Sequence, residues 1–271
     1  MLTDNKIAII GTGNLGSSIA SGLLKEHFPA SNLWVTRRKT ELLKKFTEQG
    51  VNTGADNIKA IKSANIIIIA VKPFMISEIL VEIASHLREN QLLVSVVSGI
   101  SIEKIRKDLN GNKLTICRAM PNTAIAINQS MTCISAPKAS ENQKKLVSDL
   151  FSGLGESVFI NEELMDASTV LAACGIAFVM RFIRAMVQGG IEIGFDSQTA
   201  RLIANQTVKG AAELLIQNKL HPEEEIDKVT TPKGYTISGL NEMEHNGFSS
   251  SLIKGILTSY RKIEKANLKV D

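Results

Sequence analysis

A glycine-rich turn near the start of the chain constrains the fold more than any other feature. The apolar run Ile7–Ile10 predicts a strand, and Gly11-Thr12-Gly13-Asn14-Leu15-Gly16 follows it, opening a helix predicted over Asn14–Lys25. In a dinucleotide-binding turn, the first glycine permits the bend, the second lets backbone approach a pyrophosphate, and the third allows close helix–strand packing. We therefore predict a dinucleotide site rather than an ordinary glycine-rich turn, with the following residues at the cofactor: Gly11, Gly13, Asn14, Leu15 and Gly16.

The first 160 residues alternate short apolar runs with amphipathic stretches. The continuous run Ile66–Val71 is typical of a strand buried on both faces. Other strands are predicted at Leu33–Thr36, Leu92–Val97, Lys113–Cys117 and Met131–Ile134. This spacing implies right-handed crossovers and a mainly parallel sheet with helices on both faces. Residues 1–160 are therefore predicted to form an α/β Rossmann-type domain that binds the dinucleotide.

From Glu162 onward, helical periodicity replaces the strand pattern, and residues 161–271 are predicted to form an all-α domain. Helices are expected at Glu162–Ile191, Gln198–Gln217 and Phe248–Lys265. The long first helix could be a membrane hairpin or a dimer interface. Its longest apolar run, Val170–Met180, is too short to span a bilayer. Because such an apolar helix is hard to bury within one small helical domain, we predict an intertwined homodimer.

The end of the second strand indicates which dinucleotide is bound. An NAD enzyme is expected to carry Asp or Glu there for the adenosine ribose hydroxyls. This chain has Thr36, Arg37 and Arg38 instead. A hydroxyl and two guanidinium groups suit a ribose 2′-phosphate, although one arginine could simply face solvent. We predict NADP(H) as the preferred cofactor, with NAD(H) possible.

Composition excludes several other classes of protein. Hydrophobic residues make up 44% and charged residues 21% of the 271 residues, which is typical of a soluble globular protein. The formal net charge is +4 and the basic residues are spread along the chain, so nucleic-acid binding is not predicted. Cys117, Cys133 and Cys174 share no metal-ligand spacing, and we expect them to be small core residues with no metal site. Without a signal-peptide layout, the prediction is a cytoplasmic protein.

Three further motifs give the chain a family resemblance. Val71-Lys72-Pro73 and Arg118-Ala119-Met120-Pro121-Asn122-Thr123 each follow a predicted strand, and Thr231-Pro232-Lys233-Gly234-Tyr235-Thr236 lies in the helical half. In this order, and over essentially the whole chain, they resemble the pyrroline-5-carboxylate reductase family. The resemblance implies reduction of the cyclic imine L-Δ1-pyrroline-5-carboxylate to L-proline with NAD(P)H. It also implies a helical domain that interlocks in a homodimer, with larger assemblies of dimers.

The resemblance also implies roles for single residues. Asn57 would meet the adenosine end of the cofactor. Val71, Lys72 and Pro73 would lie near its ribose and nicotinamide, although the Lys72 amine could instead cap carbonyls at the strand end. Residues lining the nicotinamide pocket would be Met120, Pro121 and Asn122. The substrate would meet Cys174, Lys233, Gly234, Tyr235 and Thr236.

This sequence departs from the family pattern where the substrate should bind. The family usually has a Gly-Ser-Gly-Pro turn in the long helix, and this chain has Ala173-Cys174-Gly175-Ile176. In the later loop, Lys233 stands in place of a glycine and Tyr235 in place of a small residue. Lys233 could add a cation for a carboxylate or point to solvent. Tyr235 could narrow the pocket, replace a hydroxyl contact or be a buried packing residue.

The expected chemistry needs few protein groups. A protonated imine is already a good hydride acceptor, so orientation supplies much of the rate and no histidine acid is required. We therefore expect the four histidines to be surface residues and Thr236 to be the catalytic residue that orients the imine nitrogen. Two rivals remain: a reductase of a related imine or keto substrate, and an NADPH-binding protein without turnover. A hydroxyacid dehydrogenase is disfavoured, because the long helix lacks a lysine.

Overall fold

The computed structural model describes residues 2–267, which divide into two compact units. Unit 1 contains residues 2–174 and 260–267, and unit 2 contains residues 175–259. The last strand ends at Phe159, in agreement with the predicted change from α/β to all-α structure near residue 160. The segment 162–174 nevertheless packs with the sheet in unit 1. The predicted domain boundary at residue 160 therefore marks a change of class and not the point where the packing divides.

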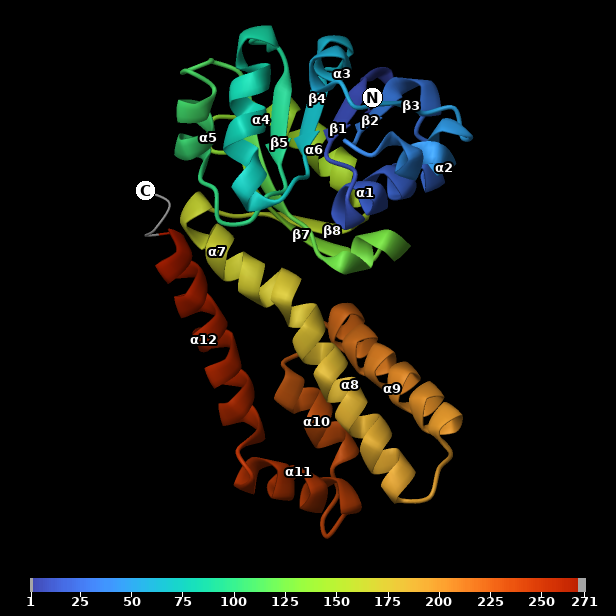
Figure 1. The fold of residues 1–271 in the computed structure, drawn as a ribbon. Coiled ribbons are helices and arrows are strands. Elements are labelled where there is room, and N and C mark those ends of the chain that lie inside the picture. The colour runs from blue at the N-terminus through green and yellow to red at the C-terminus, as the bar shows by residue number, and fades with distance from the viewer. Residues whose placement is uncertain (1, 268–271) are drawn as a thin grey trace. The chain divides into compact units, whose positions relative to one another are not determined.

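Unit 1 is built on one eight-stranded sheet with the order β3-β2-β1-β4-β5-β6-β7-β8 (Figure 1). The strands are β1 (Ile7–Ile10), β2 (Leu33–Thr36), β3 (Asn52–Gly54), β4 (Ile66–Ile69), β5 (Leu92–Ser95), β6 (Thr115–Met120), β7 (Ser130–Ser135) and β8 (Gly155–Phe159). Strands β1 to β6 are parallel, β7 pairs antiparallel with β6, and β8 is parallel to β7. This confirms the mainly parallel sheet.

Two apolar layers cover the two faces of the sheet. One layer joins alternate strand residues such as Ile9 and Ile68 to α1, α2 and α6, and the other joins Ile10 and Ile67 to α3, α4 and α5. The helices are α1 (Asn14–Lys25), α2 (Lys44–Thr47), α3 (Asn57–Ser63), α4 (Ile76–Ile83), α5 (Ile102–Asp108) and α6 (Glu141–Ser152). Burial on both faces explains why these strands are continuously apolar.

The helical run that begins at Glu162 is not a uniform α-helix. It contains η7 (Glu162–Leu164), α7 (Met165–Ser168) and a π-helical turn, η8 (Thr169–Cys174), before α8 (Gly175–Glu192). Unit 2 adds α9 (Ser197–Asn218), α10 (Pro222–Val229), α11 (Tyr235–His245) and α12 (Phe248–Asn267), whose last residues belong to unit 1. The three long helices predicted from the sequence are present, and α10 begins at Pro222, the first-turn position that proline favours.

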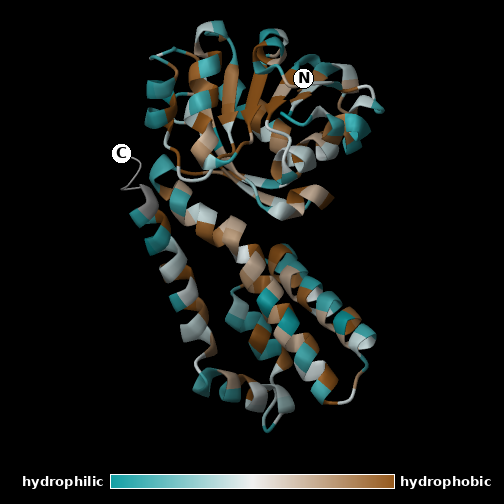
Figure 2. Cartoon of the chain, in the orientation of Figure 1, coloured by the Kyte–Doolittle hydropathy of each residue, from teal (hydrophilic) through white to brown (hydrophobic). Residues whose placement is uncertain are grey.

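Unit 2 buries few of its apolar side chains. Its buried residues are Val187 of α8 and Ala200 and Ala204 of α9. By length and composition, Glu162–Glu192 could cross a membrane, and only 11% of its most apolar window is buried. Figure 2 shows hydrophobic residues along these helices as well as in the sheet. The chain alone therefore leaves much apolar surface of unit 2 uncovered.

Candidate functional site

The glycine-rich loop has the geometry that a dinucleotide requires. Gly11 has a φ of +94°, and a Cβ at this position would lie 2.4 Å from Val71 Cγ1. A Cβ at Gly16 would lie 2.3 Å from the Gly11 carbonyl oxygen, so α1 packs directly on the loop. A Cβ at Gly13, by contrast, would have nothing within 4 Å. Gly13 is thus the open position where a pyrophosphate can approach the first turn of α1.

The loop lies at the point where the order of the sheet reverses. β1 lies between β2 and β4, and the loop after β1 meets the segment after β4 through Gly11 and Val71. Ligands of open α/β sheets bind at this switch point, outside the carboxyl ends of the strands. Lys72 and Pro73 follow at the same edge, both exposed, and Pro73 begins the 3-10 turn η4 (Pro73–Met75). The predicted cofactor residues after β1 and β4 are therefore brought together.

Thr36 and Arg37 hold the glycine loop in place. The buried Thr36 accepts hydrogen bonds at its carbonyl oxygen from the Thr12 amide and the Thr12 hydroxyl, each at 2.9 Å. Its own hydroxyl donates to Asn57 Oδ1 at 2.8 Å. The Arg37 guanidinium donates from Nη1 to the Thr12 carbonyl at 2.9 Å. Both side chains therefore already have partners in the protein, which the sequence did not indicate.

Helix α4 places two carboxylates beside Arg38 and Asn57, which are predicted to meet the adenosine end of the cofactor. Arg38 Nη2 lies 3.7 Å from Glu78 Oε2, and both side chains are largely exposed. One turn further along, Glu82 Oε2 accepts a hydrogen bond from Asn57 Nδ2 at 3.1 Å. Sequence reasoning missed both glutamates, although their spacing of four residues on an amphipathic helix places them on one face. Together, the loop, the switch point and Arg38 fit a dinucleotide with a 2′-phosphate.

The Arg118–Thr123 motif overlaps β6, and all of its residues except Thr123 are buried. The predicted strand ended at Cys117, but Arg118, Ala119 and Met120 pair with β7, and this pairing extends the strand. Met120, Pro121 and Asn122 are buried. Asn122 Oδ1 accepts from the Ala124 amide at 3.0 Å, and Nδ2 donates to the Ala172 carbonyl at 3.3 Å. Asn122 thus ties the end of the sheet to the π-helical turn.

Arg118 makes a second connection to the same helical run. Its side chain is buried, with Nη1 at 3.4 Å from Glu162 Oε1 and Nη2 at 3.9 Å from Asp166 Oδ1. Glu162 Oε1 also accepts from the Ile102 amide at 2.6 Å. Buried arginine is held by these paired carboxylates, which fixes the start of the run against β6. Cys174, the predicted substrate residue at the end of the π-helical turn, is only partly buried.

The loop that precedes α11 belongs to unit 2. Gly234 caps α11 and donates its amide to the Thr231 carbonyl at 2.8 Å, and a Cβ at Gly234 would lie 2.6 Å from Thr231 Oγ1. Lys233 has a φ of +60°. The interpretation of Tyr235 as a buried packing residue is wrong within the single chain, where it is 99% exposed because it opens α11 in a sparsely buried unit. Thr236 is exposed in the first turn of α11.

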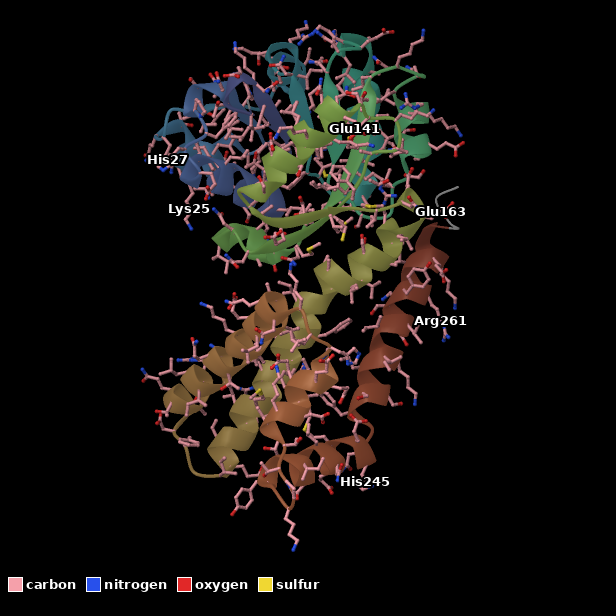
Figure 3. The ribbon with its side chains drawn as sticks, turned by 180° about the vertical axis from the view of Figure 1, so that it is seen from behind. Lys25, His27, Glu141, Glu163, His245 and Arg261 are labelled. Carbon is pink, nitrogen blue, oxygen red and sulfur yellow. The ribbon has the colours of Figure 1, made fainter. Side chains whose placement is uncertain are left out.

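Histidines and cysteines are the other groups that could bind a metal or act as nucleophiles. Among residues 2–267, no group of three or more His, Cys, Asp or Glu side chains could hold a metal. His27 and His245 are exposed, each at the end of a helix (Figure 3). Burial raises the pKa of the Cys117 thiol to about 12. Burial also raises the pKa of Cys133, opposed by a hydrogen bond with Ser168, so both thiols stay protonated at neutral pH.

Comparisons with known proteins agree with this arrangement. Residues 162–266 match the family described as pyrroline-5-carboxylate reductase dimerisation. Residues 6–99 match the family described as NADP oxidoreductase coenzyme F420-dependent. Pyrroline-5-carboxylate reductase 2 of Dictyostelium discoideum is 42% identical over 282 residues, covering 98% of this chain and 94% of that protein.

Two other relatives differ in how far the match extends. Pyrroline-5-carboxylate reductase 1 of Dictyostelium discoideum is 45% identical over 274 residues, covering 96% of this chain. The chain spans 50% of that relative's length. The crystal structure of the Plasmodium falciparum pyrroline carboxylate reductase with NADP bound has 25% identity and a TM-score of 0.88, covering 98% of this chain and 99% of that one. Both halves of the chain are therefore matched along their length.

Proposed function

Because the chain belongs to the pyrroline-5-carboxylate reductase family, we propose that it reduces L-Δ1-pyrroline-5-carboxylate to L-proline with NADPH. The structural observation that carries the proposal is the glycine loop, with its open face at Gly13 and its contact with Val71. NADPH, when bound, supplies the hydride, and one proton completes the reduction of the C=N bond. The chain's own residues bind, orient and shield the reactants.

The cofactor would lie along the carboxyl edge of the sheet. Gly11, Gly13, Asn14, Leu15 and Gly16 would hold the pyrophosphate through backbone amides at the start of α1. Thr36, Arg37, Arg38 and Asn57 would surround the adenosine end. The nicotinamide end would meet Val71, Lys72, Pro73, Met120, Pro121 and Asn122. Since Thr36, Arg37 and Asn122 are engaged in internal hydrogen bonds, they would act mainly by fixing the shape of the site.

The substrate would meet Cys174 and the loop Lys233–Thr236. The Gly234 backbone would hold the substrate carboxylate, and the exposed Lys233 could add a cation to it. The Thr236 hydroxyl would orient the imine nitrogen by a hydrogen bond, since its own acidity is too low for proton donation. Orientation of donor and acceptor then supplies much of the rate. We further propose a cytoplasmic homodimer formed through the C-terminal helices, with larger assemblies of dimers.

The direct test follows the absorbance of NADPH as it is oxidised by the five-membered imine, with the six-membered imine and NADH run in parallel. We expect turnover with the five-membered ring and NADPH. Thr236→Ala should lower kcat by about 100-fold, and Thr236→Ser should recover most of it. NADPH binding without oxidation by either imine would identify a cofactor-binding protein without turnover. Faster turnover of the six-membered ring would assign the altered loop a new substrate preference.

A further inference from the structure

The two arginines after β2 are in different situations. Arg37 is half-buried and donates from Nη1 to the Thr12 carbonyl, so its guanidinium is committed to the glycine loop. The Arg38 side chain is 73% exposed, and its ion-pair partner Glu78 is 75% exposed. Exposed ion pairs are weak and are screened by salt. Arg38 is therefore the arginine that is free to bind a phosphate. To do so, it must give up its ion pair with Glu78.

We propose that Glu78 is a specificity-determining residue that weakens the binding of NADPH relative to NADH by competing with the 2′-phosphate for Arg38. The proposal rests on the proposed function only in taking NADPH as the cofactor at this edge of the sheet. The 2′-phosphate carries close to two negative charges and forms forked hydrogen bonds with a guanidinium. NADH has a 2′-hydroxyl in place of this phosphate, so its binding does not require Arg38 to leave Glu78.

The position of Glu78 gives this competition two parts. To bind the phosphate, Arg38 must exchange the carboxylate oxygen that now lies 3.7 Å from Nη2. After the exchange, the Glu78 carboxylate remains on α4 beside Arg38, and therefore close to a phosphate of like charge that Arg38 would bind. At close range in a solvated setting, the repulsion changes affinity by about three- to tenfold. Glu82, in contrast, is held by Asn57 and does not pair with Arg38.

The decisive measurement is the dissociation constant of each nucleotide, followed by nicotinamide fluorescence, for the wild type and Glu78→Gln. We expect Glu78→Gln to tighten NADPH by about three- to tenfold and to leave NADH within twofold. Adenosine 2′,5′-bisphosphate should show the same gain, because it contains only the adenosine end. High salt should abolish the gain. Glu89→Gln removes an equal charge at the amino end of β5, the opposite edge of the sheet, and should change neither nucleotide.

The same titrations in an Arg38→Ala background distinguish competition for Arg38 from a direct electrostatic effect of the Glu78 charge on the nucleotide. If Glu78 acts through Arg38, Glu78→Gln should give less than half of its gain in that background. An equal gain with Arg38 absent, an equal gain for NADH, or no gain at all would overturn the proposal. These outcomes are independent of imine turnover: a failed proposed function appears as no NADPH oxidation, whereas a failed inference appears as unchanged nucleotide selectivity.

Discussion

Unit 1 and unit 2 solve the problem of burying apolar surface in different ways. In unit 1, the strands are covered on both faces, and residues such as Ile67 and Ile68 are fully buried within the chain. In unit 2, buried side chains are confined to Val187, Ala200 and Ala204 among the described residues. Leu202, Ile203 and Leu214 give α9 an apolar stripe that is uncovered, with Leu202 70% exposed.

This difference assigns separate tasks to the two halves. Unit 1 has an internal core and can hold a cofactor site at its sheet edge without help. Unit 2 leaves many of its large apolar side chains exposed, which is typical of a surface that a partner covers. The match of residues 162–266 to a dimerisation family supports dimer formation through these helices, and in the proposed homodimer a second copy of the chain would cover this surface. The same surface explains why Glu162–Glu192 also meets the length and composition of a membrane span.

The largest predicted effect comes from placing a charge on the exposed stripe of unit 2. Leu202→Asp should raise the dissociation constant of the dimer by at least about 100-fold, because it would bury an unpaired carboxylate in the interface. Sedimentation analysis over a range of protein concentrations measures the change, and nucleotide titration should show that NADPH binding to unit 1 is retained. A dimer of unchanged affinity would mean that the α9 stripe is not the interface.

The matched control places the same charge on exposed apolar surface of unit 1. Leu42 is 49% exposed, so it resembles Leu202 in chemistry but lies in the half with an internal core. Leu42→Asp should leave the dimer dissociation constant unchanged. If both variants dissociate the dimer equally, the contrast between the two units is wrong.

A cavity in the core of unit 1 should cost stability without affecting assembly directly. Ile68→Ala removes a fully buried side chain from the central strand β4, and we expect the free energy of unfolding to fall by about 2–5 kcal/mol. Denaturant titration at two protein concentrations tests this. The loss should be the same at both concentrations, whereas a loss that depends on concentration would show that unit 1 also relies on the partner copy.

The buried thiol of unit 1 predicts a pH dependence that unit 2 should lack. The pKa of Cys117 is raised from 9.0 to about 12 by burial, so the folded protein keeps the proton where the unfolded chain loses it. The stabilisation is present in full below pH 9 and is lost as pH rises toward 12. At about pH 10 it should have fallen by about 1.4 kcal/mol relative to neutral pH.

The Cys117→Ala variant provides the reference for this measurement. It is less stable near neutral pH because of its cavity, but its unfolding free energy should lack the Cys117 contribution to the slope above pH 9. Identical slopes in the two proteins would show that the thiolate is tolerated in the folded state.

The two units also differ in how much of their structure could be predicted from the sequence. The sheet, its parallel order and the glycine loop were predictable because each follows from a local pattern: apolar runs, alternation, and GxGxxG after a strand. Strands β3 and β8 and helix α6 were not assigned from the sequence. β8 carries exposed residues on an edge strand, so its apolar signal is weak.

The details of the site were not predictable, because they depend on contacts across the fold. The pattern Thr36-Arg37-Arg38 suggested three phosphate ligands, yet Arg37 turns back to Thr12 and Thr36 bonds to Asn57. Nothing local in the sequence indicates that Glu78, forty residues later, pairs with Arg38. Likewise, the predicted strand ended at Cys117, because the sequence did not indicate that residues 118–120 pair with β7. This antiparallel pairing extends β6 to Met120.

The smallest predicted effect concerns the departure from the family pattern in unit 2. Lys233 stands where the family usually has glycine, and the structure gives this residue a φ of +60°. This left-handed conformation lowers the stability of the folded protein by about 1 kcal/mol for a lysine, whereas a glycine adopts it without this cost. Lys233→Gly should therefore raise the free energy of unfolding by up to about 1 kcal/mol, less the entropy that glycine adds to the unfolded chain.

Comparison with Lys233→Ala separates strain from charge. Alanine keeps the strain and removes the cation, so it should not stabilise the protein, but it should raise the KM for the imine as much as Lys233→Gly if the cation holds the substrate carboxylate. An unchanged KM in both variants would mean that Lys233 points to solvent. In that case Lys233 would be strained without contributing to substrate binding. The loop would then share its backbone shape with the family, and the lysine cation would add nothing to it.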